Sequence, residues 1–353
     1  MTRGELQGVA PSAGRLIAMV LVTGVLGGAV GAQEAPLTVE AVNEAQFAPV
    51  PADTVSATIL KAQVLLDRAR FSVGAIDAKN NENLQRALAA FQSDNGLEAT
   101  GQLDEPTWSK LTATSSAPVL INYEVRAADV RGPFSGNIPS EWEQMAKLAR
   151  LAYSGPREAL AERFHMHEGL LNALNPNASF NDVGKAIVVA NVRADTELAE
   201  GGGNGAQTAK SGGGEPRVTR IEVDKTKRTV RAFDRLGHLV AFYPASVGSA
   251  DKPSPHGTFK IQRVYFNPAY RYDPKFAFPE VKTQKKFSIN PGPNNPVGSV
   301  WIDLNAPSYG IHGTPEPENV ARTDSHGCVR LTNWDVIALA ALVDRGTVVH
   351  LKE

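Results

Sequence analysis

Cys328 is the only cysteine of the 353-residue chain, and the residues around it are suited to activating a thiol. It follows Ser325-His326-Gly327, it precedes Arg330, and His312 lies 16 positions upstream. A free cysteine titrates at about 8.5, so it needs a nearby base or positive charge to act as a nucleophile at neutral pH. Histidine can act as the base, and arginine supplies the positive charge. Backbone N–H groups near Gly327 and Cys328 could then bind an oxyanion, because glycine lets a substrate approach the backbone closely.

Structural interpretations of the same residues are also open. A single cysteine could be an inert member of a core. His312, His326 and Cys328 could instead be three zinc ligands, but no fourth ligand accompanies them at a spacing usual for zinc. We therefore expect no metal and no cofactor. Five other histidines are predicted to take no part in the chemistry: His165, His167, His238, His256 and His350.

Residues 1–32 are predicted to be a signal peptide. Arg3 and Arg15 make its start basic, residues 16–30 are uncharged and largely apolar, and Val30-Gly31-Ala32 offers small residues for cleavage. The run holds 15 residues, fewer than the roughly 20 that cross a bilayer, so we expect no stable span after cleavage. An uncleaved anchor is the alternative. Exported proteins usually pair their cysteines, so a single thiol in a periplasmic protein favours a chemical role.

Composition and hydrophobic period predict a multidomain fold for the rest of the chain. A three-helix N-terminal domain, a small α/β middle region and a mainly-β C-terminal domain are expected, and the seven glycines between 201 and 214 indicate a flexible linker. Thr332 and Asp335 predict the start of a helix that belongs to the core rather than to the site. A net charge of −1 gives no reason to expect a nucleic-acid partner. The predicted parts are a spacer at 33–56, the helical domain at 57–112, the middle region at 120–193, the linker at 194–216 and the C-terminal domain at 217–353.

The C-terminal domain resembles the L,D-transpeptidases with a YkuD-type catalytic domain. That family has a histidine, about 14 to 17 further residues, and then Ser/Thr-His-Gly-Cys, which His312 and Ser325-His326-Gly327-Cys328 match. The match extends to Arg330 and, upstream, to His256-Gly257-Thr258-Phe259 and to residues 292–298. It covers about residues 218–352.

The resemblance implies a role for each matching residue. Cys328 would be the nucleophile, His312 its base, and the carbonyl of Gly313 the group that orients the imidazole. Ser325-His326-Gly327 would shape the oxyanion pocket. Arg330 would hold a substrate carboxylate or the active loop, with a structural salt bridge as its alternative.

Two further resemblances concern the N-terminal half. Residues 57–112 resemble the three-helix peptidoglycan-binding domain, on Gly74-Ala75-Ile76-Asp77, the run at 84–92 and Thr100-Gly101-Gln102-Leu103-Asp104. The family usually has glycine where Ala78 stands. Residues 120–193 weakly resemble a LysM glycan-binding module, on Leu174-Asn175-Pro176 and the strand after it, with an unrelated α/β spacer as the alternative.

These resemblances imply an enzyme that forms 3→3 cross-links in peptidoglycan from tetrapeptide stems by way of a cysteine acyl-enzyme. Stem peptides and glycan are the expected partners. Water as acceptor would make it an L,D-carboxypeptidase, and a lipoprotein lysine would make it a protein-anchoring transpeptidase. A non-catalytic peptidoglycan-binding protein is the alternative of another class, and the intact His312 and Cys328 speak against it.

Overall fold

The computed structural model describes residues 37–193, 217–249, 251–276 and 281–353. The predicted signal peptide and the predicted linker at 194–216 lie outside the described residues. Within the described ranges, no helix is both long and apolar enough to cross a membrane.

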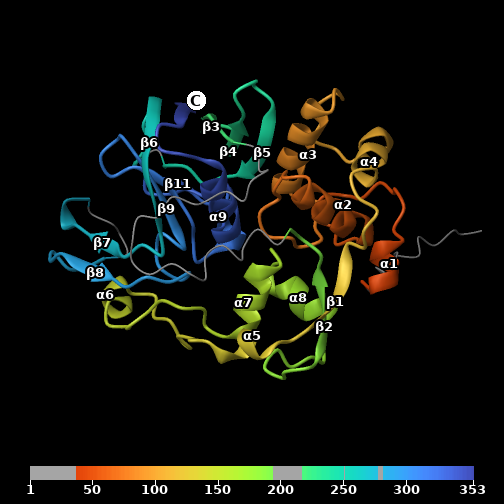
Figure 1. Cartoon of the computed structure of the whole chain (residues 1–353), viewed down its shortest axis with the longest axis horizontal. Helices are drawn as coiled ribbons and strands as arrows, with labels where there is room; N and C mark the ends of the chain where they lie inside the picture. Colours follow the sequence, from red (N-terminus) through yellow and green to blue (C-terminus); the bar gives the residue numbers. More distant parts are fainter. Residues whose placement is uncertain (1–36, 194–216, 250, 277–280) are drawn as a thin grey trace, which may run out of the picture. The chain divides into compact units, whose positions relative to one another are not determined.

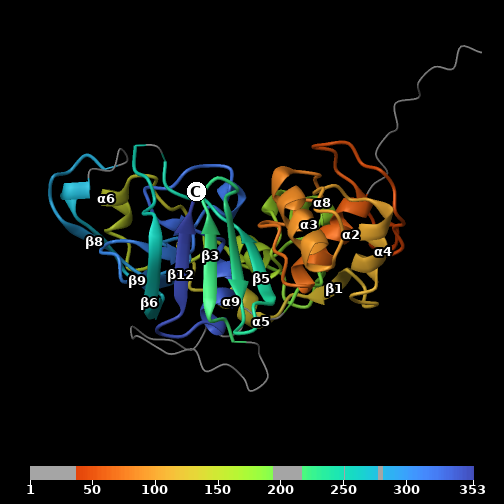
Figure 2. The same ribbon diagram turned by 90° about the horizontal axis from the view of Figure 1, so that it is seen from above.

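The C-terminal part is built on one eight-stranded sheet, which confirms its predicted mainly-β fold. Its strand order is β11-β10-β9-β6-β12-β3-β4-β5, and Figure 2 shows β6, β12 and β3 side by side, with β5 at the edge beyond them. A small hairpin, β7–β8, lies outside that sheet. Strand bounds are β3 Arg220–Asp224, β4 Thr229–Phe233, β5 Leu239–Pro244, β6 Gly257–Phe266, β7 Tyr270–Tyr272, β8 Phe287–Ile289, β9 Val300–Leu304, β10 Gly310–His312, β11 Val329–Arg330 and β12 Val348–Lys352.

The helix that covers part of this sheet is α9, Asn333–Leu342, which packs against β9 and β10 (Figure 1). It begins where the sequence predicts, because the Thr332 hydroxyl accepts the Asp335 N–H at 3.1 Å as an N-cap. Val336, Leu339 and Ala340 are fully buried in the core of the sheet. The first turn of α9 therefore has a fixed place beside the strand that carries His312.

The N-terminal domain has the three predicted helices, and each begins at a polar cap. Ser56, Asn81 and Asp104 accept backbone N–H groups from the first turns of α2, α3 and α4. The segment predicted as a spacer also holds a short helix, α1, whose Val42 is completely buried in the same core. That burial was not predicted, because five residues are too few to show a period. Helix bounds are α1 Val39–Asn43, α2 Ala57–Arg68, α3 Glu82–Asp94 and α4 Glu105–Thr112.

The middle region is small and contains both helices and strands. Strands β1 and β2 pair antiparallel, and the helices lie between them in the chain. Most of its buried apolar side chains share one core with the N-terminal domain. The LysM resemblance stays a prediction. The elements are β1 Leu120–Glu124, α5 Ala127–Arg131, α6 Trp142–Met145, α7 Pro156–Arg163, α8 Glu168–Leu174 and β2 Ala186–Ala190.

The N-terminal half is bonded directly to the C-terminal sheet through its edge strand β5. Phe242 of β5 is fully buried in the core of the N-terminal half rather than in the core of its own sheet. Its N–H donates to the Arg70 carbonyl at 2.9 Å, and its carbonyl accepts the Ser72 N–H at the same distance. An edge strand has unpaired backbone groups, and here the N-terminal domain pairs two of them.

A buried polar group lies beside that contact and joins three parts of the chain. His165 Nδ1 is 2.9 Å from Asp67 Oδ2, and the His165 ring stacks on Trp334 at a centroid distance of 5.2 Å. The Ser72 hydroxyl donates to Asp335 Oδ2 at 2.9 Å. Burial raises the pKa of Asp335 to about 7; its bonds from Thr332 and Ser72 and the charge of His165 act against this, and the charge of Asp67 adds to it. His165 therefore has a structural role.

The raised pKa of Asp335 predicts a pH-dependent stability. The folded protein binds this proton more tightly than the unfolded chain does, so the free energy of unfolding should fall as pH rises from about 4 to about 7. The slope from one proton is at most about 1.4 kcal/mol per pH unit. In Asp335→Asn we expect that part of the slope to vanish in thermal unfolding measured across this range. Equal slopes in the two proteins would contradict the prediction.

Candidate active site around Cys328

Two neighbouring strands bring His312 and Cys328 to one face of the sheet. Strands β10 and β11 are parallel, with Ile311 beside Val329 and His312 beside Arg330. Residues paired in register share a face, and residues two apart along a strand do so as well. Cys328 directly precedes β11, so its side chain lies on the face of Arg330 and His312. Ile311 and Val329 point the other way and are buried in the core.

His312 is held in one tautomer by a backbone carbonyl. Its Nδ1 lies 2.6 Å from the Gly313 carbonyl oxygen, and since a carbonyl only accepts, Nδ1 carries the proton. In the neutral ring Nε2 is then the acceptor. Burial, and after it the charge of Arg330, lower the pKa of His312 to about 3 against the opposing bond to Gly313. The ring also stacks on Trp301 at 5.5 Å. At neutral pH it is an uncharged imidazole with a fixed orientation.

The Cys328 thiol is protonated in this environment. Burial raises its pKa to about 11, although the Gly310 backbone and the charge of Arg330 act in the opposite direction. Its Sγ donates to the Ser308 carbonyl at 3.7 Å. The sequence predicts that neighbouring histidine and arginine would favour the thiolate. In the structure desolvation outweighs them, so the thiol and the imidazole are both uncharged at neutral pH.

Hydrogen bonds fix the turn that ends at the thiol. The Ser325 hydroxyl donates to the Cys328 carbonyl and accepts the Gly327 N–H at 3.2 Å. Gly327 has a φ of +113°, and a Cβ there would lie 3.0 Å from the Tyr309 ring, so only glycine fits. Because Ser325 engages its N–H, Gly327 could serve an oxyanion only by exchanging that bond. His326 is half-buried in the same turn.

The turn has a further support that the sequence did not indicate. The Ser254 hydroxyl donates to the Gly327 carbonyl at 2.7 Å and accepts the Gly248 N–H at 2.8 Å. Ser254 is buried and lies 74 positions before Cys328 in the chain. No local pattern marks such a residue, because its role depends on two loops that meet only in the fold.

Gly313 is packed from behind by Asn333, the first residue of α9. A Cβ on Gly313 would lie 2.2 Å from Asn333 Oδ1, so the amide occupies the place of a side chain. The same oxygen accepts the Ser299 N–H at 2.9 Å. The prediction that α9 belongs only to the core is therefore incomplete, since its first residue abuts the backbone that orients His312.

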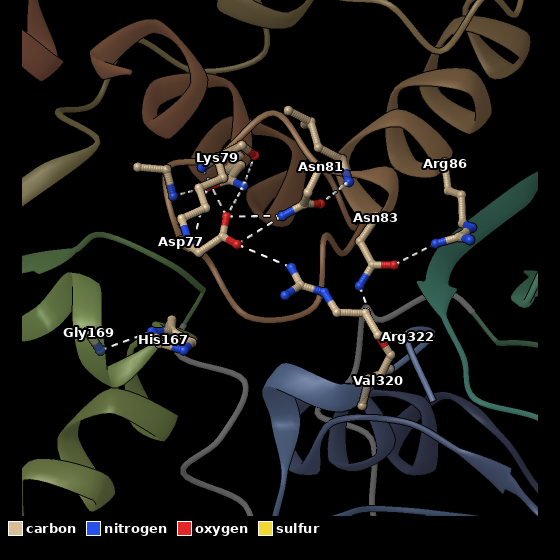
Figure 3. Close-up of polar contacts among 12 residues, drawn as sticks. Asp77, Lys79, Asn81, Asn83, Arg86, His167, Gly169, Val320 and Arg322 are labelled. Carbon is tan, nitrogen blue, oxygen red and sulfur yellow. Dashed lines mark hydrogen bonds and ion pairs between the residues drawn. The ribbon is translucent and has the colours of Figure 1, made fainter. Parts of the chain in front are cut away.

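The loop between His312 and Cys328 is bonded to the N-terminal domain. Arg322 Nη2 lies 3.2 Å from Asp77 Oδ2, and Asn83 Nδ2 donates to the Val320 carbonyl at 3.0 Å (Figure 3). Asn81 Nδ2 donates to both oxygens of Asp77 and so holds this carboxylate in place (Figure 3). The turn that carries the resemblance to a peptidoglycan-binding domain thus contacts the loop that leads into the active site.

Arg330 lies beside both reacting residues. It is half-buried, and its backbone N–H and carbonyl both bond to Ser246, at 2.8 and 3.0 Å. Its charge lowers the pKa values of His312 and of Cys328. Its predicted role in binding a carboxylate stays a prediction. Among the residues that the structure describes, no group of three or more His, Cys, Asp or Glu side chains is arranged to hold a metal.

Two family models match the chain. The model described as "L,D-transpeptidase catalytic domain" matches residues 218–351, and the model described as "Putative peptidoglycan binding domain" matches residues 56–111. Neither model covers the middle region, which contains α7 and α8.

Curated relatives are similar to the C-terminal part. The "Putative L,D-transpeptidase YkuD" of Bacillus licheniformis is 34% identical over 132 residues, which are 37% of this chain and 64% of that protein. A "Putative L,D-transpeptidase in ATP synthase subunits region ORF 5" of Fuscovulum blasticum is 30% identical over 133 residues, 37% of this chain and 68% of that protein. The chain thus spans less than two thirds of the first of these relatives.

Solved structures of low overall similarity include two mycobacterial proteins. L,D-transpeptidase 3 from Mycobacterium tuberculosis has a TM-score of 0.33 and 17% identity, with 39% of this chain and 62% of that chain covered. An L,D-transpeptidase from Mycobacterium smegmatis has a TM-score of 0.30 and 20% identity, with 38% and 58% covered.

The raised pKa of Cys328 predicts the pH profile of its alkylation. In the free protein, the rate of modification by iodoacetamide should keep rising through pH 8.5, because the thiolate fraction grows until the pH reaches about 11. Mass spectrometry of quenched samples measures the rate, with glutathione as the reference thiol. A rate that is already level below pH 7 would indicate a resting thiolate and contradict the prediction.

Proposed function

Because the chain belongs to the L,D-transpeptidase family, we propose that it is a peptidoglycan acyltransferase whose nucleophile is Cys328. The observation that carries the proposal is the pairing of β10 with β11. It puts the thiol and His312 on one face, while the bond from Nδ1 to Gly313 leaves Nε2 of the imidazole as an acceptor. A neutral thiol and a neutral imidazole suit a reaction in which the base takes the proton as the sulfur attacks.

The first step transfers an acyl group to the cysteine. The Cys328 Sγ attacks the carbonyl carbon of the amide between diaminopimelate and the terminal D-alanine of a tetrapeptide stem, and His312 Nε2 takes the thiol proton. The tetrahedral intermediate then loses the amine, which takes that proton from His312 as the C–N bond breaks. D-Alanine leaves, and a thioester to Cys328 remains. Backbone N–H groups of the turn around Gly327 and Cys328 would stabilise the charge on the carbonyl oxygen, and Gly327 would do so by exchanging its bond to Ser325.

The second step passes the acyl group to an amine. The side-chain amine of a second stem attacks the thioester carbon, His312 Nε2 accepts the proton of that amine, and the sulfur leaves and regains a proton from His312. The product is a 3→3 cross-link. Arg330, on the same face as Cys328, would hold a carboxylate of the stem, since a guanidinium suits bidentate binding of that group.

The location follows from the same match. Two domains that act on or bind peptidoglycan support a place outside the cytoplasm, and we propose export to the periplasm by the signal peptide at 1–32. The domain at 56–111 would provide wall affinity.

Defined muropeptides test the proposal. Purified protein incubated with a disaccharide tetrapeptide should release D-alanine and yield 3→3 dimers in chromatography coupled to mass spectrometry, and Cys328→Ser should yield neither. Loss of a positioned base lowers a reaction rate by roughly 100- to 10,000-fold, so the rate of product formation by His312→Gln should fall by that factor. His238→Gln is the matched control, because His238 is exposed and bonded to Asp234. Product formation by Cys328→Ser would overturn the nucleophile, and D-alanine release without dimers would assign a carboxypeptidase.

A β-lactam that acylates thiols gives an independent measurement. A carbapenem should add its mass to the wild-type protein, and peptide mapping should place the adduct on Cys328. Folded protein that forms no adduct at this residue would count against the acyl-enzyme.

A further inference from the structure

We propose that Glu162 is a positioning residue for His312, and that the middle region supplies it to the active site. Glu162 is the seventh residue of α7, outside both segments that the family models match. The inference rests on the proposed role of His312 as base. It assigns to the middle region a task within the C-terminal active site, through two intervening residues and without contact to the substrate.

Glu162 is linked to Asn333 by hydrogen bonds. The Asn333 Nδ2 group donates to Glu162 Oε1 at 3.0 Å and to Oε2 at 3.1 Å, and it also reaches the Pro293 carbonyl at 3.2 Å. On its other side, Asn333 Oδ1 accepts the Ser299 N–H. The Ser299 N–H only donates, so it fixes the oxygen end of the amide toward Ser299 and leaves the Nδ2 group to donate to the Glu162 oxygens. Turning the amide over would place two acceptors together and two donors together.

Asn333 is in turn linked to His312 through Gly313. Asn333 Oδ1 occupies the space behind Gly313 and Gly298, 2.2 Å from where a Cβ would stand on either residue. The carbonyl of Gly313 is the acceptor that holds His312 Nδ1. A shift of the Asn333 amide therefore moves the Gly313 backbone, to which the imidazole is bonded. Small displacements of reacting groups have large effects on the reaction rate.

Hydrogen bonds between the middle region and the loop at 290–299 hold Glu162 beside Asn333. Its Leu151 N–H donates to the Pro291 carbonyl, and the Leu151 carbonyl accepts the Asn294 N–H, both at 3.0 Å. Asn294 Nδ2 reaches the Ala152 carbonyl at 3.1 Å and Glu158 Oε1 at 2.7 Å. The loop that carries Pro293 and Ser299 is thus bonded on one side to the middle region and on the other to Asn333.

The burial of Glu162 indicates a specific task rather than general packing. Its side chain is only slightly exposed, the Tyr153 hydroxyl donates to Oε2 at 3.1 Å, and burial raises its pKa to about 8. A buried carboxyl is costly, and an apolar side chain of similar volume often stabilises a fold as well or better. An apolar side chain could not fix the orientation of Asn333. The carboxyl therefore offers what packing alone does not, a defined direction for the amide behind Gly313.

A double-mutant cycle on the alkylation rate of Cys328 tests the proposal. Glu162→Ala should lower the rate constant for iodoacetamide at pH 8 by about tenfold in the wild-type background. In the His312→Ala background it should have no further effect, because Glu162 acts through the imidazole. Glu168→Gln is the control, since Glu168 is an exposed carboxylate of the same region that pairs with Arg157. Equal effects in both backgrounds, or an unchanged rate in folded Glu162→Ala, would overturn the proposal.

A polarity exchange keeps the test decisive if Glu162→Ala does not fold. Glu162→Gln retains an acceptor for Asn333 Nδ2 and should alkylate within about twofold of wild type. Asn333→Asp alone puts a second carboxyl group against Glu162, and above pH 8, where Glu162 is ionised, the repulsion of the two charges should displace the side chain and slow alkylation. The double variant E162Q/N333D restores one donor between the two side chains and should recover part of the rate. A double variant no faster than Asn333→Asp alone would overturn the proposal.

The readout separates this inference from the proposed function. Iodoacetamide is a small electrophile, so at pH 8, where little of the thiol is ionised, the part of its rate that is lost in His312→Ala reports the His312–Cys328 pair without any peptidoglycan substrate. If wild-type protein makes no muropeptide product but the cycle shows coupling, the acyl-transfer proposal fails and the positioning role stands. If cross-links form and the coupling is missing, the positioning role fails alone.

Discussion

The hydrogen bond from His312 Nδ1 to the Gly313 carbonyl is the interaction on which the rest of the site depends. It assigns the ring proton to Nδ1 and leaves Nε2 as the acceptor on the face that Cys328 shares. A backbone carbonyl is a weaker partner than a carboxylate, but it cannot change its protonation state. The fold must therefore hold the Gly313 carbonyl in position. Asn333 packs directly behind Gly313 and leaves no room for a side chain at residue 313.

Desolvation decides the resting charges of the reacting pair. Burial holds the pKa of His312 near 3 and that of Cys328 near 11, and Arg330 lowers the pKa values of both. The arginine thus favours the thiolate and opposes the imidazolium, so it does not stabilise an ion pair as a whole. Uncharged resting groups suit the proposed reaction, in which charge develops only during attack on a substrate carbonyl.

The sequence identifies Cys328 and His312 as the candidate nucleophile and base because the motif that contains them is local. Cys328, His312 and the glycines beside them form a short motif, and the helix start at Thr332 follows a local capping pattern. Asn333, Ser254 and Glu162 carry no such mark. Glu162 lies 171 positions before the asparagine that it contacts, and its burial depends on packing between α7 and α9. Period and composition describe one element at a time, so they place a helix but do not reveal which polar residue it brings to another part of the chain.

The contact between the two halves of the chain changes how the wall-binding part is understood. Glycine-rich composition at 194–216 predicts a tether between independent bodies, yet the segments on either side of it are bonded at Phe242, at Asp335 and at Arg322. The last of these bonds joins Asp77 of the N-terminal domain to the loop between His312 and Cys328. A domain that contacts this loop cannot leave the catalytic sheet without releasing it. The position of the N-terminal domain and the geometry of the loop before Cys328 are for this reason physically linked.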